Sequence, residues 1–242
     1  MVRTLSIVLA TILCGYILVV SLLLTHKSHD AVCEDVLFVV RDSLDKHFIN
    51  EADLGGILRR EGVKILNEPI DEINTEQIEN VLRKNDMIAD VQVYKTPSNK
   101  IKMEVEQKMP ILRVITPTKS YYIDNKGSSM ALSRRYVALV PVASGAIEKE
   151  FAMTDLYKFA LFLQEDEFWN NQIEQIFVHP DGDVELIPRV GKHRILLGSF
   201  SDFREKLDNL MLFYQQAIPK VGWEKYSIIN LKYKNQIVCT KR

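Results

Sequence analysis

Cysteine is scarce in this sequence, and the few cysteines follow no recognisable pattern. Only Cys14, Cys33 and Cys239 occur among the 242 residues, and no CxxC or cysteine–histidine spacing accompanies them. A disulfide framework and a zinc site are therefore not expected. Cys33 and Cys239 can form a disulfide in an oxidising compartment or remain two free thiols. Because their spacing fits no known cysteine pattern, two free thiols are the preferred prediction.

An excess of positive charge is also missing. The chain has 31 lysines and arginines against 32 aspartates and glutamates, so its formal net charge is -1. Nucleic-acid-binding proteins carry a clear basic excess, and the sequence therefore predicts no nucleic-acid partner. Hydrophobic residues make up 47% of the chain and charged residues 26%, which is the composition of an ordinary globular protein.

Catalytic motifs are absent as well. The sequence contains no GxSxG, HExxH, Walker A or GxGxxG motif, and so predicts no enzyme, no cofactor and no small-molecule substrate. The nearest approach to a catalytic cluster is His179 with Asp181 and Asp183. Aspartate and glycine are typical of hairpin turns, so we expect a turn here, with no catalytic residue and no metal site. His193, between two basic residues, is predicted to be exposed at a strand edge.

A long apolar run is what the sequence does contain. The twenty residues from Leu5 to Leu24 carry no charge, and a helix of that length spans roughly the 30 Å hydrocarbon core of a bilayer. A signal peptide is the alternative, but its apolar region is usually shorter and ends in a small-x-small cleavage site, whereas this run ends in LTHK. We therefore expect an uncleaved membrane anchor, with residues 1–26 as tail and span and 27–33 as a linker.

The charges on either side of this run predict its orientation. Arg3 and the α-amino group lie on the short N-terminal side, whereas Asp30, Glu34 and Asp35 soon follow on the other side. Positively charged flanks stay on the cytoplasmic side of a membrane. The sequence therefore predicts a single-pass type II protein of the cytoplasmic (inner) membrane, with its main domain periplasmic or otherwise extracytoplasmic.

Residues 34–109 are predicted to form a small α+β domain. Strand, helix, helix, strand and strand patterns follow one another at 35–41, 51–60, 75–85, 89–94 and 101–106. Asn74 or Thr75 can cap the second helix. The last two segments alternate apolar and polar residues around turn residues, which predicts a hairpin with one buried face. Two helices can then cover the apolar face of a three-stranded sheet.

The hairpin and the segment after it resemble a known family. The stretch IADVQVYKTPSNKIKMEVEQKMPILRV has a valine-rich strand, a turn with proline, a strand ending at Glu106, and Pro110, which opens the next domain. With Asp124 and Gly127 further on, this order resembles the FtsQ/DivIB family of bacterial cell-division proteins. Glu106 to Lys108 departs from the family's usual Glu-Arg before the proline. The resemblance covers nearly the whole chain and implies a POTRA (polypeptide-transport-associated) module followed by a β domain.

Residues 110–242 are expected to form a mixed β-sheet domain with at least two helices on the sheet. Strand-like runs occur at 112–115, 120–123, 136–141, 173–178, 184–187, 194–197 and 227–239, the last being a strand or a strand pair. One helix is predicted after a cap at Thr154, and another after Asp202, with Pro219 preventing its continuation. The apolar stripe from Phe203 to Tyr214 is interpreted as a core face.

The final strand is where the resemblance places function. The run INLKY at 229–233 is similar to the family's Ile-Asp-Leu-Arg-Tyr motif, with Asn230 and Lys232 as departures. In the family, this strand and the residues after it receive a segment of the small membrane protein FtsB, which is itself paired with FtsL. The resemblance therefore implies the partner-binding residues Ile229, Leu231, Tyr233, Asn235, Gln236, Ile237, Val238 and Cys239. Without the resemblance, Tyr233 is a packed strand aromatic.

Together these patterns predict a non-enzymatic, membrane-anchored cell-division scaffold. By the resemblance, it binds FtsB/FtsL-like proteins and other divisome components outside the cytoplasmic membrane and helps to control septal wall synthesis. The expected mechanism is strand addition at a sheet edge. Two alternatives remain open. One is a membrane-tethered cell-wall enzyme, whose catalytic cluster would have to come from distant residues. The other is a POTRA-type export or chaperone component.

Overall fold

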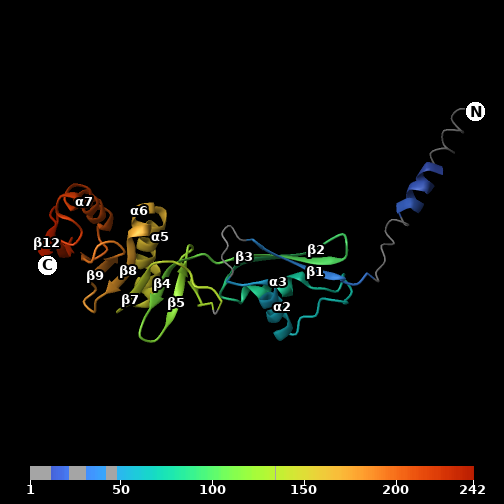
Figure 1. The fold of residues 1–242 in the computed structure, drawn as a ribbon. Helices are drawn as coiled ribbons and strands as arrows, with labels where there is room; N and C mark the ends of the chain where they lie inside the picture. Colours follow the sequence, from blue (N-terminus) through green and yellow to red (C-terminus); the bar gives the residue numbers. More distant parts are fainter. Residues whose placement is uncertain (1–11, 22–30, 42–47, 134) are drawn as a thin grey trace, which may run out of the picture. The chain divides into compact units, whose positions relative to one another are not determined.

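The computed structural model describes residues 12–21, 31–41, 48–133 and 135–242 (Figure 1). Half of the anchor predicted between Leu5 and Leu24 lies outside these residues; the other half, 12–21, is helical. Within the described ranges, no helix is both long and apolar enough to cross a membrane. The described residues divide into two compact units: the first contains 51–84 and 91–105 with the described residues up to Arg41, and the second contains 48–50, 85–90, 106–133 and 135–242.

The first unit contains all or most of five elements in the predicted β-α-α-β-β order. They are β1 (Asp35–Arg41), α2 (Glu51–Arg60), α3 (Thr75–Arg83), β2 (Ile88–Lys95) and β3 (Lys100–Gln107). The sheet order is β1-β3-β2, so the last strand is the central one. Ile101, Met103 and Val105 on β3 are fully buried, as their alternation predicts. The predicted helix cap is confirmed, because the Asn74 side chain accepts the N–H of Gln77 at 3.0 Å.

A charged cluster links the three strands of this unit. Glu104 on β3 accepts hydrogen bonds from Lys102 Nζ at 2.8 Å and from the Tyr94 hydroxyl of β2 at 2.6 Å, and it also pairs with Arg41 of β1. The hydrogen bond from Lys102, followed by that from Tyr94, lowers the pKa of Glu104 to about 2. Glu104 therefore stays ionised at any ordinary pH and holds the strands in register.

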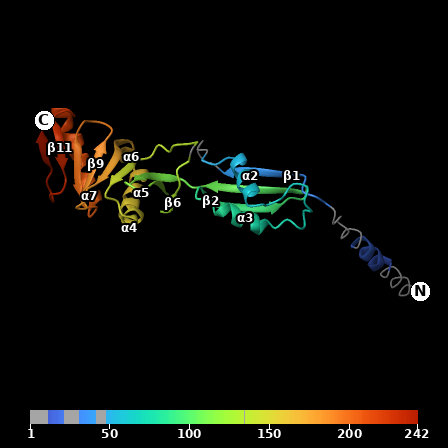
Figure 2. The ribbon, with the colours of Figure 1, turned by 90° about the horizontal axis from the view of Figure 1, so that it is seen from below.

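A nine-stranded mixed sheet forms the second unit. Its strands are β4 (Pro110–Ile115), β5 (Ser120–Asp124), β6 (Ser129–Met130), β7 (Val142–Gly145), β8 (Ile173–Val178), β9 (Val184–Pro188), β10 (Arg194–Gly198), β11 (Tyr226–Asn230) and β12 (Val238–Lys241). They lie in the order β12-β11-β10-β9-β8-β7-β4-β5-β6. β7 runs parallel to β4 and β8, and β11 runs parallel to β10, while the other pairs are antiparallel. In Figure 2, β11 lies at the end of the unit, close to the C-terminus.

Helices on one side of this sheet enclose the main core. They are α4 (Lys149–Phe151), the π-helical turn η1 (Ala152–Leu156), α5 (Tyr157–Glu165), α6 (Glu167–Gln172), α7 (Phe203–Gln216) and α8 (Ile218–Val221), and Figure 1 shows α5, α6 and α7 along the same side. Phe159, Leu207 and Leu210 are fully buried against sheet residues such as Ile176 and Ile195. The stripe on α7 is thus a core face, as its helical spacing predicts.

The prediction of a strand at 136–141 is wrong. These residues form no ladder, and β7 begins only at Val142. Pro141 cannot donate a hydrogen bond, and its carbonyl oxygen accepts the N–H of Arg113 at 3.0 Å. Ala138 instead donates its N–H to the Tyr122 hydroxyl at 3.2 Å and joins a small buried cluster with Phe48 and Tyr122. The segment therefore packs on the sheet without becoming part of it.

One predicted helix cap is also wrong, and the other, Asp202, occupies the N-cap position without the expected side-chain hydrogen bond. Helical structure begins at Lys149, so Thr154 lies inside η1, where its hydroxyl donates to the carbonyl oxygen of Glu150 at 2.8 Å. Asp202 adopts a left-handed conformation, with φ 54°, and its side chain makes no capping hydrogen bond to α7. Asp166, which the apolar pattern did not single out, does cap α6 by accepting the N–H of Trp169 at 3.0 Å.

Two glycines of the second unit allow a direct test of packing at β7. A Cβ added to Gly145, where φ is +107°, would lie 2.1 Å from the carbonyl oxygen of Val178. Gly182 also has a positive φ, +88°, but has nothing within 4 Å of that position. We expect Gly145→Ala to lower the free energy of unfolding by at least about 3 kcal/mol, and Gly182→Ala by only about 1–2 kcal/mol. Denaturation followed by tryptophan fluorescence measures this, because Trp169 and Trp223 both lie in this unit. Equal losses would contradict it.

Candidate functional site

The last strand of the chain lies at one end of the nine-stranded sheet. β12 pairs antiparallel with β11 through Ile229↔Cys239 and Asn230↔Val238, and no other strand of the described chain pairs with β12. The final element is thus a strand pair, one of the two predicted forms. An edge strand carries unpaired backbone N–H and C=O groups, which another chain can use.

The predicted site residues fall into two groups. Ile229 and Leu231 are buried, and Leu231 donates its N–H to the Leu196 carbonyl oxygen at 2.9 Å, so both lie inside the sheet. Tyr233 is 52% exposed in the loop between β11 and β12. The other members lie along this loop and the edge strand: Asn235, which has φ 60°, the exposed Gln236, the half-buried Ile237, and Val238 and Cys239 of β12. The structure therefore brings the second group together at the edge.

The hydrogen bond made by the residue after β12 indicates which way the backbone groups of this strand point. Arg242 donates its N–H to the carbonyl oxygen of Lys225 at 3.3 Å, and so faces the β11 side. Backbone groups of successive strand residues point in opposite directions. The N–H of Lys241 therefore points away from β11, toward the open side of the sheet, whereas its carbonyl oxygen accepts a hydrogen bond from the Ser227 hydroxyl of β11 at 3.4 Å.

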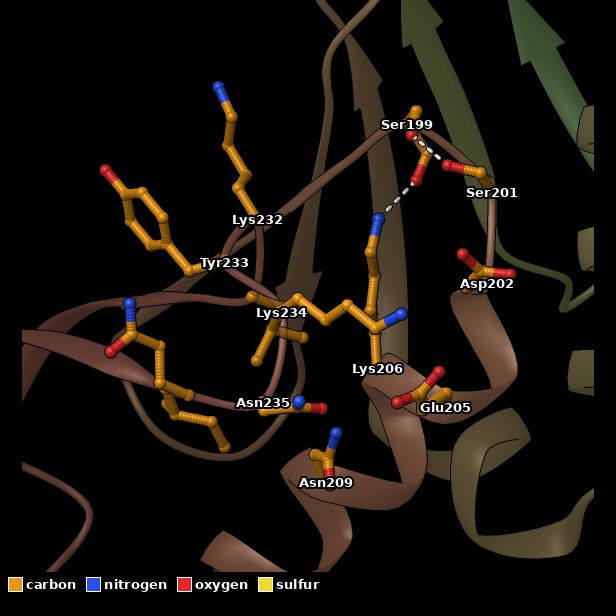
Figure 3. Close-up of a pocket in the computed structure, with 13 residues that line it drawn as sticks. Ser199, Ser201, Asp202, Glu205, Lys206, Asn209, Lys232, Tyr233, Lys234 and Asn235 are labelled. Carbon is orange, nitrogen blue, oxygen red and sulfur yellow. Dashed lines mark hydrogen bonds between the residues drawn. The ribbon is translucent and has the colours of Figure 1, made fainter.

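A cavity of about 200 Å³ lies beside this loop. Figure 3 shows that residues from the start of α7 and from the β11–β12 loop surround it. Its lining residues are mostly polar: Ser199, Ser201, Asp202, Glu205, Lys206, Asn209, Leu231, Lys232, Tyr233, Lys234, Asn235, Gln236 and Ile237. The cavity therefore lies between the loop that carries Tyr233 and the first turns of α7.

Two lysines fix the walls of this cavity. Lys206 on α7 donates to the carbonyl oxygens of Leu197 at 3.0 Å and Ser199 at 2.8 Å, and burial lowers the pKa of its ammonium group. Lys232 forms an ion pair with Asp183, and this hydrogen bond raises the pKa of Lys232. The second pair ties the β11–β12 loop to the turn that precedes β9. Lys232 thus holds the loop, while Lys206 holds the start of α7 to the end of β10.

Comparison with known families identifies both units. A POTRA-like domain model matches residues 31–106, and the model described as "FtsQ/DivIB, C-terminal related" matches residues 109–240. The chain belongs to the FtsQ/DivIB C-terminal-related family. It is an α+β protein with a POTRA-like domain followed by a mixed sheet domain, as the resemblance implied, and it is a relative of FtsQ/DivIB. No curated protein matches the chain.

In this FtsQ/DivIB-related chain, the predicted turn at His179 to Asp183 is confirmed. The N–H of His179 donates to the Asp183 carbonyl oxygen at 2.8 Å, and the Asp181 carboxylate accepts the N–H of Asp183 at 3.1 Å. Among the described residues, no group of three histidine, cysteine or acidic side chains is placed to hold a metal ion. The role of Asp183 as partner of Lys232, and the place of Lys206 in the cavity, were not predicted, since both depend on contacts between distant segments.

The prediction for His193 is wrong. His193 is buried, with 2% exposure, and its Nε2 lies 2.7 Å from the Tyr214 hydroxyl, while its ring stacks on Trp223. Burial, followed by the charge of Arg242, lowers the pKa of His193. Arg242 also donates to the Lys192 carbonyl oxygen. The end of the β12 edge therefore lies against a buried neutral histidine.

The cysteines of the FtsQ/DivIB-related chain are free thiols. Cys33 is buried and Cys239 is half-buried in β12, where burial raises the pKa of its thiol. Both behave as small apolar side chains in these positions.

Acidification should weaken the second unit through His193. Its pKa in the folded state lies below the ordinary 6.5, so the unfolded state binds more protons as the pH falls below that value. The free energy of unfolding should then fall by up to about 1.4 kcal/mol per pH unit, while remaining unaffected by this group above pH 6.5. Denaturant titrations at pH 7.5 and 5.5, followed by tryptophan fluorescence, measure the difference. His193→Gln should shrink it; an unchanged difference in this variant would refute the assignment.

Proposed function

We propose that this chain is a non-enzymatic scaffold of bacterial cell division that binds other divisome proteins by accepting a strand on the β12 edge. Its partners are small membrane proteins like FtsB and FtsL, and their binding helps to control septal wall synthesis. The observation that carries the proposal is the position of β12 at the end of the sheet, next to the exposed Tyr233.

The geometry of the edge suits strand addition. An added strand would hydrogen-bond to the outward backbone groups of β12, such as the N–H of Lys241, which supply affinity without regard to sequence. Val238 is 43% exposed and Tyr233 is 52% exposed, so both side chains are available to a partner. Exposed aromatic side chains are frequent anchors at protein interfaces.

The predicted anchor between Leu5 and Leu24 also supports a proposal for where the protein resides in the cell. The uncharged run and the charge difference across it support a single-pass type II protein of the inner membrane, with the POTRA-like and sheet domains on the outer side. A tether of this kind would keep the β12 edge close to the membrane in which FtsB-like partners reside. Confinement to one surface raises the effective concentration of the two partners.

An enzymatic role is less well supported. Two of the three lysines that line the cavity beside β12 are engaged: Lys206 with backbone carbonyl oxygens and Lys232 with Asp183. A catalytic site would need titratable groups converging on a reacting atom. POTRA-like domains and FtsQ/DivIB-related domains are typically non-catalytic, which also favours the scaffold over a cell-wall enzyme.

Two substitutions test the edge. Tyr233→Ala should weaken the complex with the FtsB-like protein of the same organism about 30-fold, the loss typical of an aromatic anchor. Lys241→Pro should weaken it about tenfold, because proline removes an N–H that points to the open side. Co-purification of the full chain with the co-expressed partner, followed by titration of the purified proteins, measures both effects.

Matched variants separate these effects from damage to the fold. Lys241→Ala keeps the backbone N–H, so its affinity for the partner should lie within about twofold of that of the original chain. Tyr233→Phe distinguishes the contribution of the ring to binding from that of the hydroxyl. All variants should unfold at the same denaturant concentration. Undiminished binding by both Tyr233→Ala and Lys241→Pro would rule out the β12 edge as the docking site.

A further inference from the structure

The opposite end of the nine-stranded sheet also has an open edge. β6 pairs with β5 only through Tyr122↔Met130 and Ile123↔Ser129, so it stops before Ser120 and Tyr121. In the part of the chain that the structure covers, no other strand pairs with β5 on that side. The first two residues of β5 therefore form a short unpaired edge.

The backbone at this edge points outward. Asp124, four residues further along β5, donates its N–H to Ser128 at 2.9 Å, on the β6 side. Backbone groups of alternate strand residues point the same way, so the N–H and C=O of Ser120 also point to that side, beyond the end of β6. A strand placed in line with β6 would meet them.

A cavity of about 580 Å³ lies along the same edge. Tyr121, Ile147 and Met153 belong to the partly buried apolar residues at the main core, and Met130 of β6, which packs in the separate buried cluster with Tyr122, also lines the cavity. Ser120 also lines the cavity, and its Oγ is buried without a hydrogen-bond partner among the described residues. Buried hydroxyls in proteins are nearly always paired, so this atom lacks a partner that a ligand could supply.

The apolar residues that line the cavity and the Ser120 hydroxyl lie on different sides of the sheet. Side chains alternate along a strand, so Tyr121 points to the helix side and Ser120 to the other. A peptide strand added here would place an apolar side chain on Tyr121 and Met153, and its neighbouring residue next to Ser120. The rim carries two lysines, Lys119 and Lys149, against one carboxylate, Asp86, and so favours an acidic peptide.

From this arrangement we infer that the β5 edge and its cavity form a second peptide-binding site. Its ligand is an extended segment of a partner protein in which apolar and polar residues alternate between acidic flanks. Backbone pairing with Ser120 fixes the segment, and the cavity selects its apolar side chains. The site lies at the end of the sheet opposite β12, so one sheet domain can hold two strands from different partners at once.

A synthetic peptide tests this inference on the full chain. The probe is acetyl-Glu-Leu-Thr-Val-Glu-amide, and the control replaces its threonine by proline, which keeps the charge but removes the central N–H. In a chain with ¹³C-labelled methionine methyl groups, increasing amounts of the probe should shift the NMR signals of Met130 and Met153 until the shifts reach a plateau. The signals of Met103 and Met211, which do not line the cavity, should stay in place. The proline control should bind at least about tenfold more weakly.

Variants of the chain complete the test. Ser120→Ala and Lys149→Glu should each weaken the probe about fivefold, whereas Lys158→Glu, the same charge change on α5 outside the cavity, should not. Equal binding of probe and proline control would overturn the inference in favour of a simple apolar pocket. Shifts at Met130 and Met153 that appear on raising the protein concentration alone would assign the edge to a second copy. No shift at millimolar probe would also refute it. None of these outcomes depends on binding at β12.

Discussion

Burial of one apolar face of the nine-stranded sheet holds the second unit together. Phe159, Trp169 and Leu210 from three helices are almost fully buried against the central strands. This layer uses the middle of the sheet, where every strand has two neighbours. It cannot satisfy the two outermost strands, because an open sheet always leaves backbone groups unpaired at its ends. Both proposed docking surfaces result from that constraint.

The parts of the fold that could be predicted are those set by local periodicity. The POTRA-like unit was predicted element by element because its helices and hairpin carry clear 3.6 and 2.0 periods and a real cap at Asn74. The failures lie where distant contacts override local preference. The run at 136–141 has strand composition, but Pro141 and the contact with Tyr122 keep it out of the ladder. His193 lies between charged residues, yet Trp223 and Tyr214 bury it.

The candidate site shows the same division. A terminal strand with an exposed tyrosine could be inferred from resemblance, and its edge position needs only the sheet order. Its surroundings could not be inferred: Asp183, Lys206 and Lys232 are far apart in sequence and meet only because β9, α7 and the last loop converge at one end of the sheet. The short β6 has no sequence signal at all, since two residues are too few to show a period.

The order of pairing also bears on how the protein matures. β12 has no neighbour except β11 in the described part of the chain, and β11 in turn lies on β10, which the chain completes before it makes α7. Each of these strands needs its predecessor as a template, so the terminal strand is assembled onto an already finished platform. A polypeptide in which β11 has not paired with β10 would therefore lack the β12 edge on which the proposed docking depends.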